Sequence, residues 1–475
     1  MSFKHGVYSS EVPTSIVPPS EAMAGLPVVV GTAPIHLAKS PAVNKPVLCY
    51  EYKEAVEYLG YSDNWEAYTL CEFVKSQFTL FSVAPVVFIN VLDPVKHKKS
   101  IVDEVITLEG KEGIIKSAVL LDTLTLKDSG EQVLVKDTDY VASFNDNGEV
   151  LLTILKAQVT GTVKASFTEI DPSLVTANDI IGGIDEAGKS TGLELINEVL
   201  SRFALIPGQI VAPGWSDKPE VAAVMVAKAT IINSFFKCIA ITDIPVSECP
   251  NYGDVAAWKN ENNYTYKNQI SCWPKVRLGS AIYHLSTQIA GLNCKTDSEF
   301  DGVPYVSPSN RSLQMNGLVG KDGEEIALGI DQANYLNGQG IMTAINFYGG
   351  WKAWGNRTAI YPSSTDPKDC FIPVRRMFDW VGNTIIQTFW SKVDGPMTPR
   401  LVDTILDSLN LWLNGLSASG ALLGGRVVWL EGDNPVTSLM DGKMKFHVYL
   451  TPPSPAEELD FVLEYDVEYI KTLFA

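Results

Sequence analysis

Short, continuous runs of apolar residues, bounded by glycine or proline, recur along the chain. Such runs, rich in valine and isoleucine, are typical of strands buried on both faces of a sheet. They occupy residues 26–33, 85–92, 209–212 and 235–242. Between the last two runs, Pro219 opens a helical segment that extends to Ile232, and proline suits the first helical turn. This strand–helix–strand order predicts a βαβ unit, and hence an α/β core.

The pattern changes between residues 95 and 177, where short β-like segments replace the helical periods. Residues 140–144 and 149–155 are strand-like, and the sequence Asn-Asp-Asn-Gly between them is typical of a hairpin turn. We therefore predict a small all-β domain over residues 95–177. It would be inserted into an α/β domain formed by residues 25–94 and 178–355.

The C-terminal part combines helices with β-structure. Residues 375–390 are predicted to be helical, and Thr398 is a typical cap for a second helix whose apolar residues fall on one stripe. From Leu459 to Tyr469 apolar residues alternate with mostly acidic ones, which predicts a strand with one apolar face. We expect this strand to pair with residues 444–450. The sequence thus predicts an α+β domain over residues 356–466.

The two ends of the chain are expected to be extended arms. Residues 1–24 contain Pro13, Pro18 and Pro19 and too few apolar residues for a core of their own. Residues 467–475 continue past the predicted last domain. An arm that cannot form its own core is a suitable segment for adding a strand to another subunit's sheet.

Size and charge narrow the range of functions. A chain of 475 residues predicts two to four domains. Acidic residues number 55 and basic residues 37, and the resulting net charge of −18 argues against nucleic-acid binding. The first residues lack the apolar core of a signal peptide, and no apolar run reaches the roughly 18 residues of a membrane span.

The cysteines and histidines indicate no metal or cofactor chemistry. The seven cysteines are scattered and include no CxxC pair, and the five histidines are dispersed. This distribution predicts reduced thiols in a protein made in a cytosol, not a disulfide framework or a zinc site. We expect no catalytic residue, no cofactor and no metal ion.

One motif points to a different function. The stretch from Gly183 to Ser190 fits the pattern G-x-x-x-x-G-K-[ST] of phosphate-binding loops, and Asp243 ends a buried strand in a position to approach a magnesium ion. However, Asp185 and Glu186 would repel phosphate, and Gly192 would break the helix that should follow. We expect a surface turn, and a P-loop NTPase remains the alternative function.

Several stretches, in a fixed order, resemble contractile phage tail sheath proteins. Residues 5–12 with 27–33, residues 179–195, and residues 207–214 followed by 221–223 are similar to segments of that family. The most specific similarity lies in the sequences Leu336-Asn337-Gly338-Gln339-Gly340-Ile341, Trp354-Gly355-Asn356-Arg357-Thr358 and Val374-Arg375-Arg376. The resemblance covers residues 5–35 and 178–475.

The resemblance implies a structural subunit of a phage or of a phage-tail-like bacteriocin particle. Such subunits form hexameric rings stacked around an inner tail tube, with baseplate and tail terminator proteins at the ends, and contraction drives the tube through a target cell envelope. The inserted β domain would lie on the outside. Assembly would occur in the bacterial host cytoplasm, with no nucleic-acid partner and no membrane insertion.

Within this interpretation, two groups of residues are candidates for functional roles. The arms would join neighbouring subunits through Val7, Tyr8, Val12, Val467, Tyr469, Ile470 and Leu473. Trp354, Arg357 and Arg375 would be structural residues at the junction of the α/β and C-terminal domains. A planar guanidinium at position 357 would bridge a carboxylate or carbonyls there, and contact with the inner tube is the alternative. Another self-assembling protein, such as a surface-layer or capsid component, is a further alternative for the whole chain.

Overall fold

The computed structural model describes residues 17–145 and 147–474. An eight-stranded sheet lies at the centre of the molecule. Its strand order is β2-β3-β1-β13-β14-β15-β20-β21. The strands are β1 (Pro27–Gly31), β2 (Val47–Cys49), β3 (Val86–Asn90), β13 (Gln209–Val211), β14 (Ile239–Asp243), β15 (Gln269–Cys272), β20 (Ile341–Asn346) and β21 (Trp351–Trp354). The six inner strands are parallel, and the edge strands β2 and β21 are antiparallel to their neighbours.

Helices cover both faces of this sheet, which explains why its strands are continuously apolar. Val28 and Val30 of β1 face a core with α5 (Pro219–Thr230) and the 3₁₀ helix Gly192–Glu198. Val29 faces the opposite core. That second core contains α1 (Tyr52–Leu59), α2 (Thr69–Lys75) and α7 (Leu285–Glu299). The predicted βαβ unit is confirmed, because α5 connects the neighbouring parallel strands β13 and β14.

One predicted strand boundary is wrong. The run 235–242 was expected to be a strand throughout, but β14 begins only at Ile239. Asn233 and Ser234 have positive φ angles, and the Ile232 N–H donates to the Phe236 carbonyl at 2.8 Å. The chain therefore reverses in a tight turn over residues 233–235, closed by the bridge between Ile232 and Phe236, and the strand β14 starts only after it.

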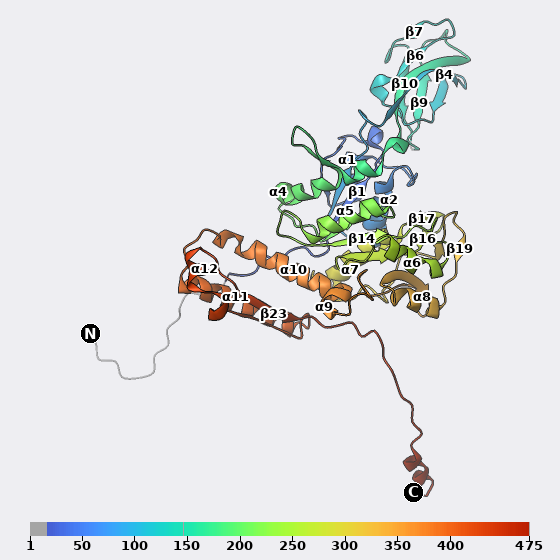
Figure 1. The fold of residues 1–475 in the computed structure, drawn as a ribbon. Helices are drawn as coiled ribbons and strands as arrows, with labels where there is room; N and C mark the ends of the chain where they lie inside the picture. The colour runs from blue at the N-terminus through green and yellow to red at the C-terminus, as the bar shows by residue number, and fades with distance from the viewer. Residues whose placement is uncertain (1–16, 146, 475) are drawn as a thin grey trace, which may run out of the picture.

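The chain between β3 and α3 (Ala177–Ile181) forms only β-strands and two short 3₁₀ helices, and it projects from one end of the molecule (Figure 1). One sheet contains β4 (Lys98–Thr107), β10 (Thr162–Ile170), β6 (Thr125–Lys127) and β7 (Val133–Leu134), and the other contains β5 (Glu112–Ile115), β9 (Val150–Ile154) and β8 (Tyr140–Phe144). The two sheets enclose an apolar core of their own. The predicted hairpin is confirmed as β8–β9, with the Asn145 N–H donating to the Glu149 carbonyl at 2.9 Å.

Smaller elements complete the α/β part. A four-stranded antiparallel sheet contains β16 (Lys275–Leu278), β17 (Ala281–Tyr283), β18 (Gly317–Val319) and β19 (Glu325–Ile326). A two-stranded hairpin contains β11 (Gly183–Ile184) and β12 (Ser190–Thr191). The remaining α-helices here are α4 (Val199–Phe203), α6 (Tyr252–Glu261), α8 (Ile330–Asn337) and α9 (Pro367–Cys370). Among the described residues, no helix is both long and apolar enough to cross a bilayer.

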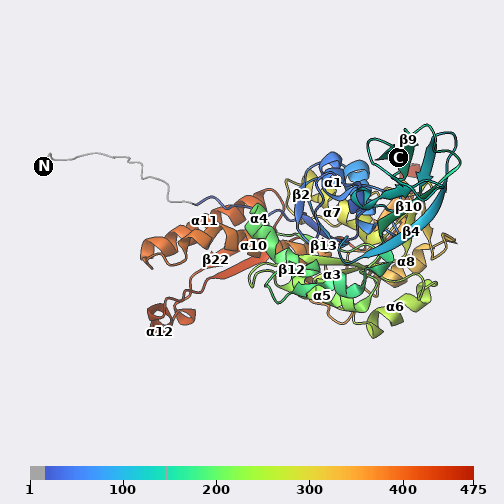
Figure 2. The ribbon, with the colours of Figure 1, turned by 90° about the horizontal axis from the view of Figure 1, so that it is seen from above.

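Two long helices and a hairpin form the C-terminal part, which extends sideways from the sheet (Figures 1 and 2). They are α10 (Ile372–Phe389), α11 (Pro399–Ala418), β22 (Gly424–Val428) and β23 (His447–Thr451), with α12 (Val436–Met440) at the far end. The cap of α11 is confirmed, since the Thr398 hydroxyl accepts a hydrogen bond from the Leu401 N–H. The apolar stripe of α11 faces the core that α10 shares with the sheet.

The predicted last strand is wrong. β23 pairs with β22, not with residues 459–469, and residues 452–466 form no strand. Residues Val467–Phe474 form a 3₁₀ helix. Pro452, Pro453 and Pro455 explain part of this difference, because prolines lack the N–H that a ladder needs and prevent a tight return of the chain beside β23. The extended region therefore begins at Pro452, and not at the expected residue 467.

Candidate interaction surfaces

Residues 17–26, here called the N-terminal strap, lie along α10 and α11. Their backbone N–H groups donate to threonine and serine hydroxyls of the two helices: Val17 to Ser408 at 2.8 Å, Ser20 to Thr388 at 3.0 Å and Ala22 to Thr384 at 3.1 Å. Two indoles add contacts, from Trp380 to the Ala22 carbonyl and from Trp412 to the Glu21 carboxylate. The strap thus connects the start of β1 to the C-terminal helices. The predicted arm residues Val7, Tyr8 and Val12 lie outside the described part of the chain.

An ion pair fixes the inner end of the strap. Arg376 pairs with Asp297 of α7, both almost fully buried, and donates to the Ala24 carbonyl at 3.3 Å. Arg375, a predicted junction residue, binds Asp369 at 3.1 Å and Asp379 at 2.8 Å. Asp379 in turn accepts from Asn268, which precedes β15. The Arg375-Arg376 pair therefore joins α10 to α9, to α7 and, through Asp379, to the segment before β15.

The predicted junction residue Arg357 binds a carboxylate that sequence reasoning did not identify. Its Nε lies 3.0 Å from Glu457 Oε1, and Nη2 binds the other carboxylate oxygen. The guanidinium stacks over the Phe371 ring at 3.9 Å and the Tyr361 ring at 4.4 Å. Trp354 lies nearby, half-buried, with its indole N–H donating to Asn334 at 2.8 Å. The only sequence signal for Glu457 was the acidic character of the C-terminal region.

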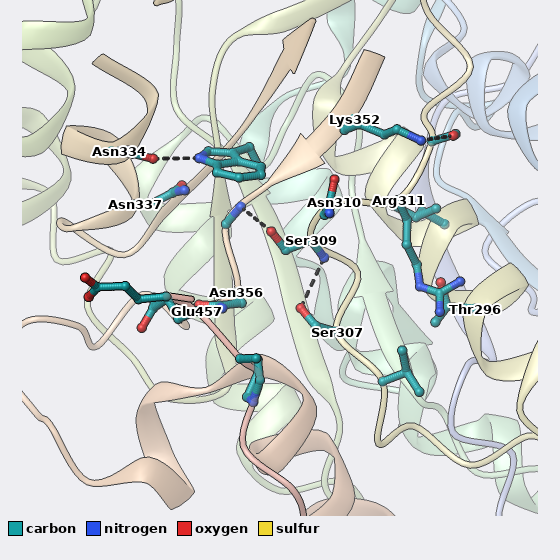
Figure 3. A pocket seen from close by; sticks show the side chains of 18 of the residues that line it. Thr296, Ser307, Ser309, Asn310, Arg311, Asn334, Asn337, Lys352, Asn356 and Glu457 are labelled. Carbon is teal, nitrogen blue, oxygen red and sulfur yellow. Dashed lines mark hydrogen bonds between the residues drawn. The ribbon is translucent and has the colours of Figure 1, made fainter. Parts of the chain in front are cut away.

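A polar groove of about 1200 Å³ lies beside this ion pair (Figure 3). Its walls come from α7, α8, β21 and residues 306–312, and residues 455–458 cross it. Amide and hydroxyl side chains dominate the lining, and many are already paired. The Ser309 hydroxyl accepts from the Gly355 N–H at 3.0 Å, and Lys352 donates to Ser312 at 2.7 Å. The groove is therefore lined by a network of hydrogen-bonded polar side chains.

Residues 452–474, here called the C-terminal segment, cross the polar groove at residues 455–458 and then run away from the rest of the molecule (Figure 1). Its apolar side chains are mostly exposed: Leu459 73%, Phe461 80%, Leu463 95%, Tyr465 79%, Val467 62%, Tyr469 73%, Ile470 43% and Leu473 79%. A monomeric protein rarely leaves such a row in water. The structure places the predicted arm residues of this segment in a short exposed helix, without assigning them a partner.

The stretch from Gly183 to Ser190 does not form a phosphate-binding loop. It forms the hairpin β11–β12, preceded by the short helix α3 instead of a buried strand. Asp185 Oδ1 accepts the N–H groups of Ala187 at 2.9 Å and Lys189 at 2.8 Å. These are backbone donors that a phosphate would need, and a carboxylate already occupies them. The NTPase alternative is therefore not supported.

Asp243, the candidate magnesium ligand, is buried in a hydrogen-bond network. It accepts from the Ser286 N–H at 3.0 Å and from the Ser216 hydroxyl at 3.1 Å. Next to it, His284 Nδ1 lies 2.7 Å from a carboxylate oxygen of the buried Glu72. Burial opposes the charged imidazolium, but the Glu72 carboxylate outweighs it and raises the pKa of His284. This network joins α2, β14 and the start of α7.

The seven cysteines are free thiols, six of them buried. Over residues 17–145 and 147–474, no cluster of three or more histidine, cysteine or acidic side chains has a geometry that could hold a metal ion.

The chain is similar to known tail sheath proteins along nearly its whole length. It is 29% identical over 495 residues to the tail sheath protein of Burkholderia phage BcepMu, covering 99% of this chain and 98% of the relative. It is 30% identical over 301 residues to a putative prophage major tail sheath protein of Pseudomonas aeruginosa, covering 61% of this chain and 72% of the relative. No family model matches the chain.

A solved structure shares the fold. The sheath complex of PVC, an extracellular contractile injection system, in its contracted state has a TM-score of 0.58 to this chain at 15% sequence identity. The match covers 99% of each chain. The mixed α/β architecture with several sheets is therefore that of a sheath subunit. Together with the two relatives, this shows that the chain belongs to the contractile tail sheath protein family and is a structural subunit of a phage or phage-like tail.

Proposed function

We propose that the chain polymerises as stacked hexameric rings around an inner tail tube, and that contraction of the stack drives the tube through a target cell envelope. Its partners would be further copies of itself, the tube protein, and baseplate and terminator proteins at the two ends. The observation that carries the proposal is the exposed apolar row of the C-terminal segment, which nothing in the described part of its own subunit covers.

The size of this row suits a stable contact between subunits. Leu459, Phe461, Leu463 and Tyr465 alternate along an extended backbone and so share one face. Burying each such side chain contributes about 1.5–3 kcal/mol, so docking the four would contribute roughly 6–12 kcal/mol before ordering costs. An extended segment with one apolar face is the form in which a strand is added to another subunit's sheet. We infer that this is how the segment joins subunits.

The other end of the chain supports the same interpretation. The N-terminal strap is held by α10 and α11, and Val17 lies against Ser408 of α11. The same C-terminal part carries the hairpin β22–β23, which leads into the C-terminal segment. Paired arms would act as hinges while the bodies reorient.

Contraction of such a lattice needs no nucleotide at the moment of firing. An extended lattice held in a metastable state would store the difference in interface burial per subunit, multiplied over all its subunits. The hairpin geometry at residues 183–191 supports this view, because it leaves no phosphate-binding loop. The particle would be a phage tail or a headless tail-like bacteriocin, assembled in the host cytoplasm, with the β domain of residues 95–177 facing outward.

The test is polymerisation of the purified chain, followed by electron microscopy. Truncation after Glu458 should give a soluble subunit with unchanged circular dichroism that forms no cylinders. The double variant Phe461→Ser/Leu463→Ser should behave in the same way, because it removes the apolar face alone. Asp460→Asn/Glu464→Gln, on the other face, is the matched control and should still polymerise. Normal cylinders from the truncated chain would refute the proposal.

A further inference from the structure

We propose that Arg357 and its aromatic neighbours form a carboxylate-binding seat whose ligand is Glu457, and that this pair fixes the point from which the C-terminal segment leaves the subunit. The role of that segment in joining subunits rests on the proposed function. The seat itself is a property of the single chain and is testable without assembly.

The seat is built for a planar, bidentate ligand. The Arg357 guanidinium stacks over the rings of Phe371 and Tyr361, and its Nη1 lies 3.0 Å from Cys370 Sγ. The Nε and Nη2 groups then face Glu457 side by side. The Arg357 side chain is only 15% exposed, whereas Glu457 is 44% exposed. The cation is thus pre-positioned by the body of the protein, and the more exposed carboxylate binds to it.

The seat belongs to the rigid α/β body. The Ala359 N–H donates to the carbonyl of Gln269 in β15 at 2.8 Å. Residues 356–358 also pair with 370–372, through the Ile372 N–H to the Asn356 carbonyl and the Thr358 N–H to the Cys370 carbonyl, both at 2.9 Å. Arg357 therefore moves with the central sheet and with the start of α10.

Glu457 lies on a different unit. β23 ends at Thr451 and pairs only with β22, which packs on α11. Residues 452–456 then span from this hairpin to the groove beside Arg357, with Pro452 buried. Without the ion pair, the segment would leave the subunit from the hairpin. With it, the segment leaves from the edge of the central sheet, at Glu458.

The position of this exit has a direct effect on assembly. If the start of the C-terminal segment is already fixed at Glu457, the segment loses less conformational entropy when its apolar residues dock on a neighbouring subunit. Glu458 makes no ion pair among the described residues, so the seat selects one of two adjacent carboxylates. Glu458→Gln is therefore a matched control for Glu457→Gln.

A nitroxide at Ser454 tests the seat in the isolated subunit. Ser454 is exposed and lies between β23 and Glu457, and six of the seven native cysteines are buried, so Ser454→Cys can be labelled against a low background measured on the unmodified chain. Glu457→Gln and Arg357→Lys should each shorten the rotational correlation time of the label about threefold or more. Glu458→Gln should not change it. Raising the salt concentration should mobilise the label in the original chain but not in Glu457→Gln.

Equal mobility in the original chain and in Glu457→Gln, or the same change in Glu458→Gln, would overturn the proposal. Polymerisation then separates this proposal from the proposed function. Glu457→Gln keeps the apolar row, so it should still form cylinders, but at a critical concentration roughly threefold to tenfold higher. If truncation after Glu458 leaves polymerisation intact, the function proposed for the segment fails, while the spin-label result still decides the seat.

Discussion

Trp380 on α10 donates its indole N–H to the backbone carbonyl of Ala22, 2.7 Å away, although 358 positions separate the two residues. Both are buried, so the bond lies in the interior, between the N-terminal strap and the C-terminal helices. It shows that the chain's first described residues are part of the packing of its last helical pair.

Trp380→Phe should therefore lower the free energy of unfolding by about 1–3 kcal/mol, because it leaves the buried Ala22 carbonyl without a donor. Trp412→Phe is the matched control, since it removes an indole hydrogen bond to the exposed carboxylate of Glu21. Urea unfolding followed by circular dichroism measures both. An effect of Trp412→Phe as large as that of Trp380→Phe would show that the loss comes from indole packing and not from the buried hydrogen bond.

Leu409→Ala on α11 should lower the free energy of unfolding by about 2–5 kcal/mol, since Leu409 is 2% exposed in the core shared with α10 and the sheet. Leu411→Ala, two positions further along the same helix at 55% exposure, should change it by less than about 0.5 kcal/mol. Thermal and urea unfolding of the two variants compare them directly. Similar losses would contradict the predicted orientation of the helix.

His36 should make the protein sensitive to acid. It packs against Tyr68 and against Phe144 of β8, its Nδ1 is buried without a hydrogen-bond partner in the structure, and burial lowers its pKa to about 4. The pKa of His36 is lower in the folded state than in the unfolded state. The stability that the neutral His36 side chain contributes is therefore complete above pH 6.5 and is lost as the pH falls toward 4. The loss is on the order of 3 kcal/mol.

The measurement is the free energy of unfolding between pH 7 and pH 4 for the original chain and for His36→Phe. The variant cannot be protonated at this position, so its stability should fall less steeply over that interval. Parallel curves for the two proteins would show that His36 does not titrate in this range. The expected site of the first opening is the contact between residues 35–37 and the hairpin β8–β9.

His284 should give the opposite pH dependence. Its pKa is raised by the buried Glu72 carboxylate, so the stabilising ion pair is fully present below the unfolded pKa of 6.5. It is lost as the pH rises through the higher folded-state pKa. His284→Gln should therefore flatten the decline of stability on the alkaline side, as measured by denaturant unfolding from pH 6 to pH 9. An unchanged slope would show that the pair is not charged in the native state.

Lys189→Ala should leave folding, polymerisation and nucleotide binding unchanged. Lys189 lies in the β11–β12 turn, where Asp185 already accepts its N–H. Titration calorimetry with millimolar ATP and magnesium should give no binding heat for either protein. A measurable affinity that the substitution removes would restore the NTPase alternative.

Local sequence signals predicted much of this structure. Val28–Val30 and 209–211 were identifiable as buried strands, since a strand covered on both faces must be apolar at every position. Pro219 and Thr398 marked helix starts because their local chemistry suits those positions in any fold. The hairpin after Asn145 was predicted for the same reason. The boundary at Phe235 failed because a tight turn can also be apolar when it packs against a neighbouring element.

The sequence by itself indicated most of the buried strands, the helix starts at Pro219 and Thr398, the absence of a helical period in the inserted region, and the apolar alternation that begins at Leu459. Only the tertiary structure decided which elements pack against these segments. The alternation after Leu459 indicates a need for a partner but not where the partner lies, and in this chain β22 already pairs with β23. Arg357 was recognisable as a bridging residue, but its ligand, Glu457, lies 100 positions away. A local pattern fixes backbone preference and burial, whereas the pairing of charges and strand edges depends on distances that only the folded chain sets.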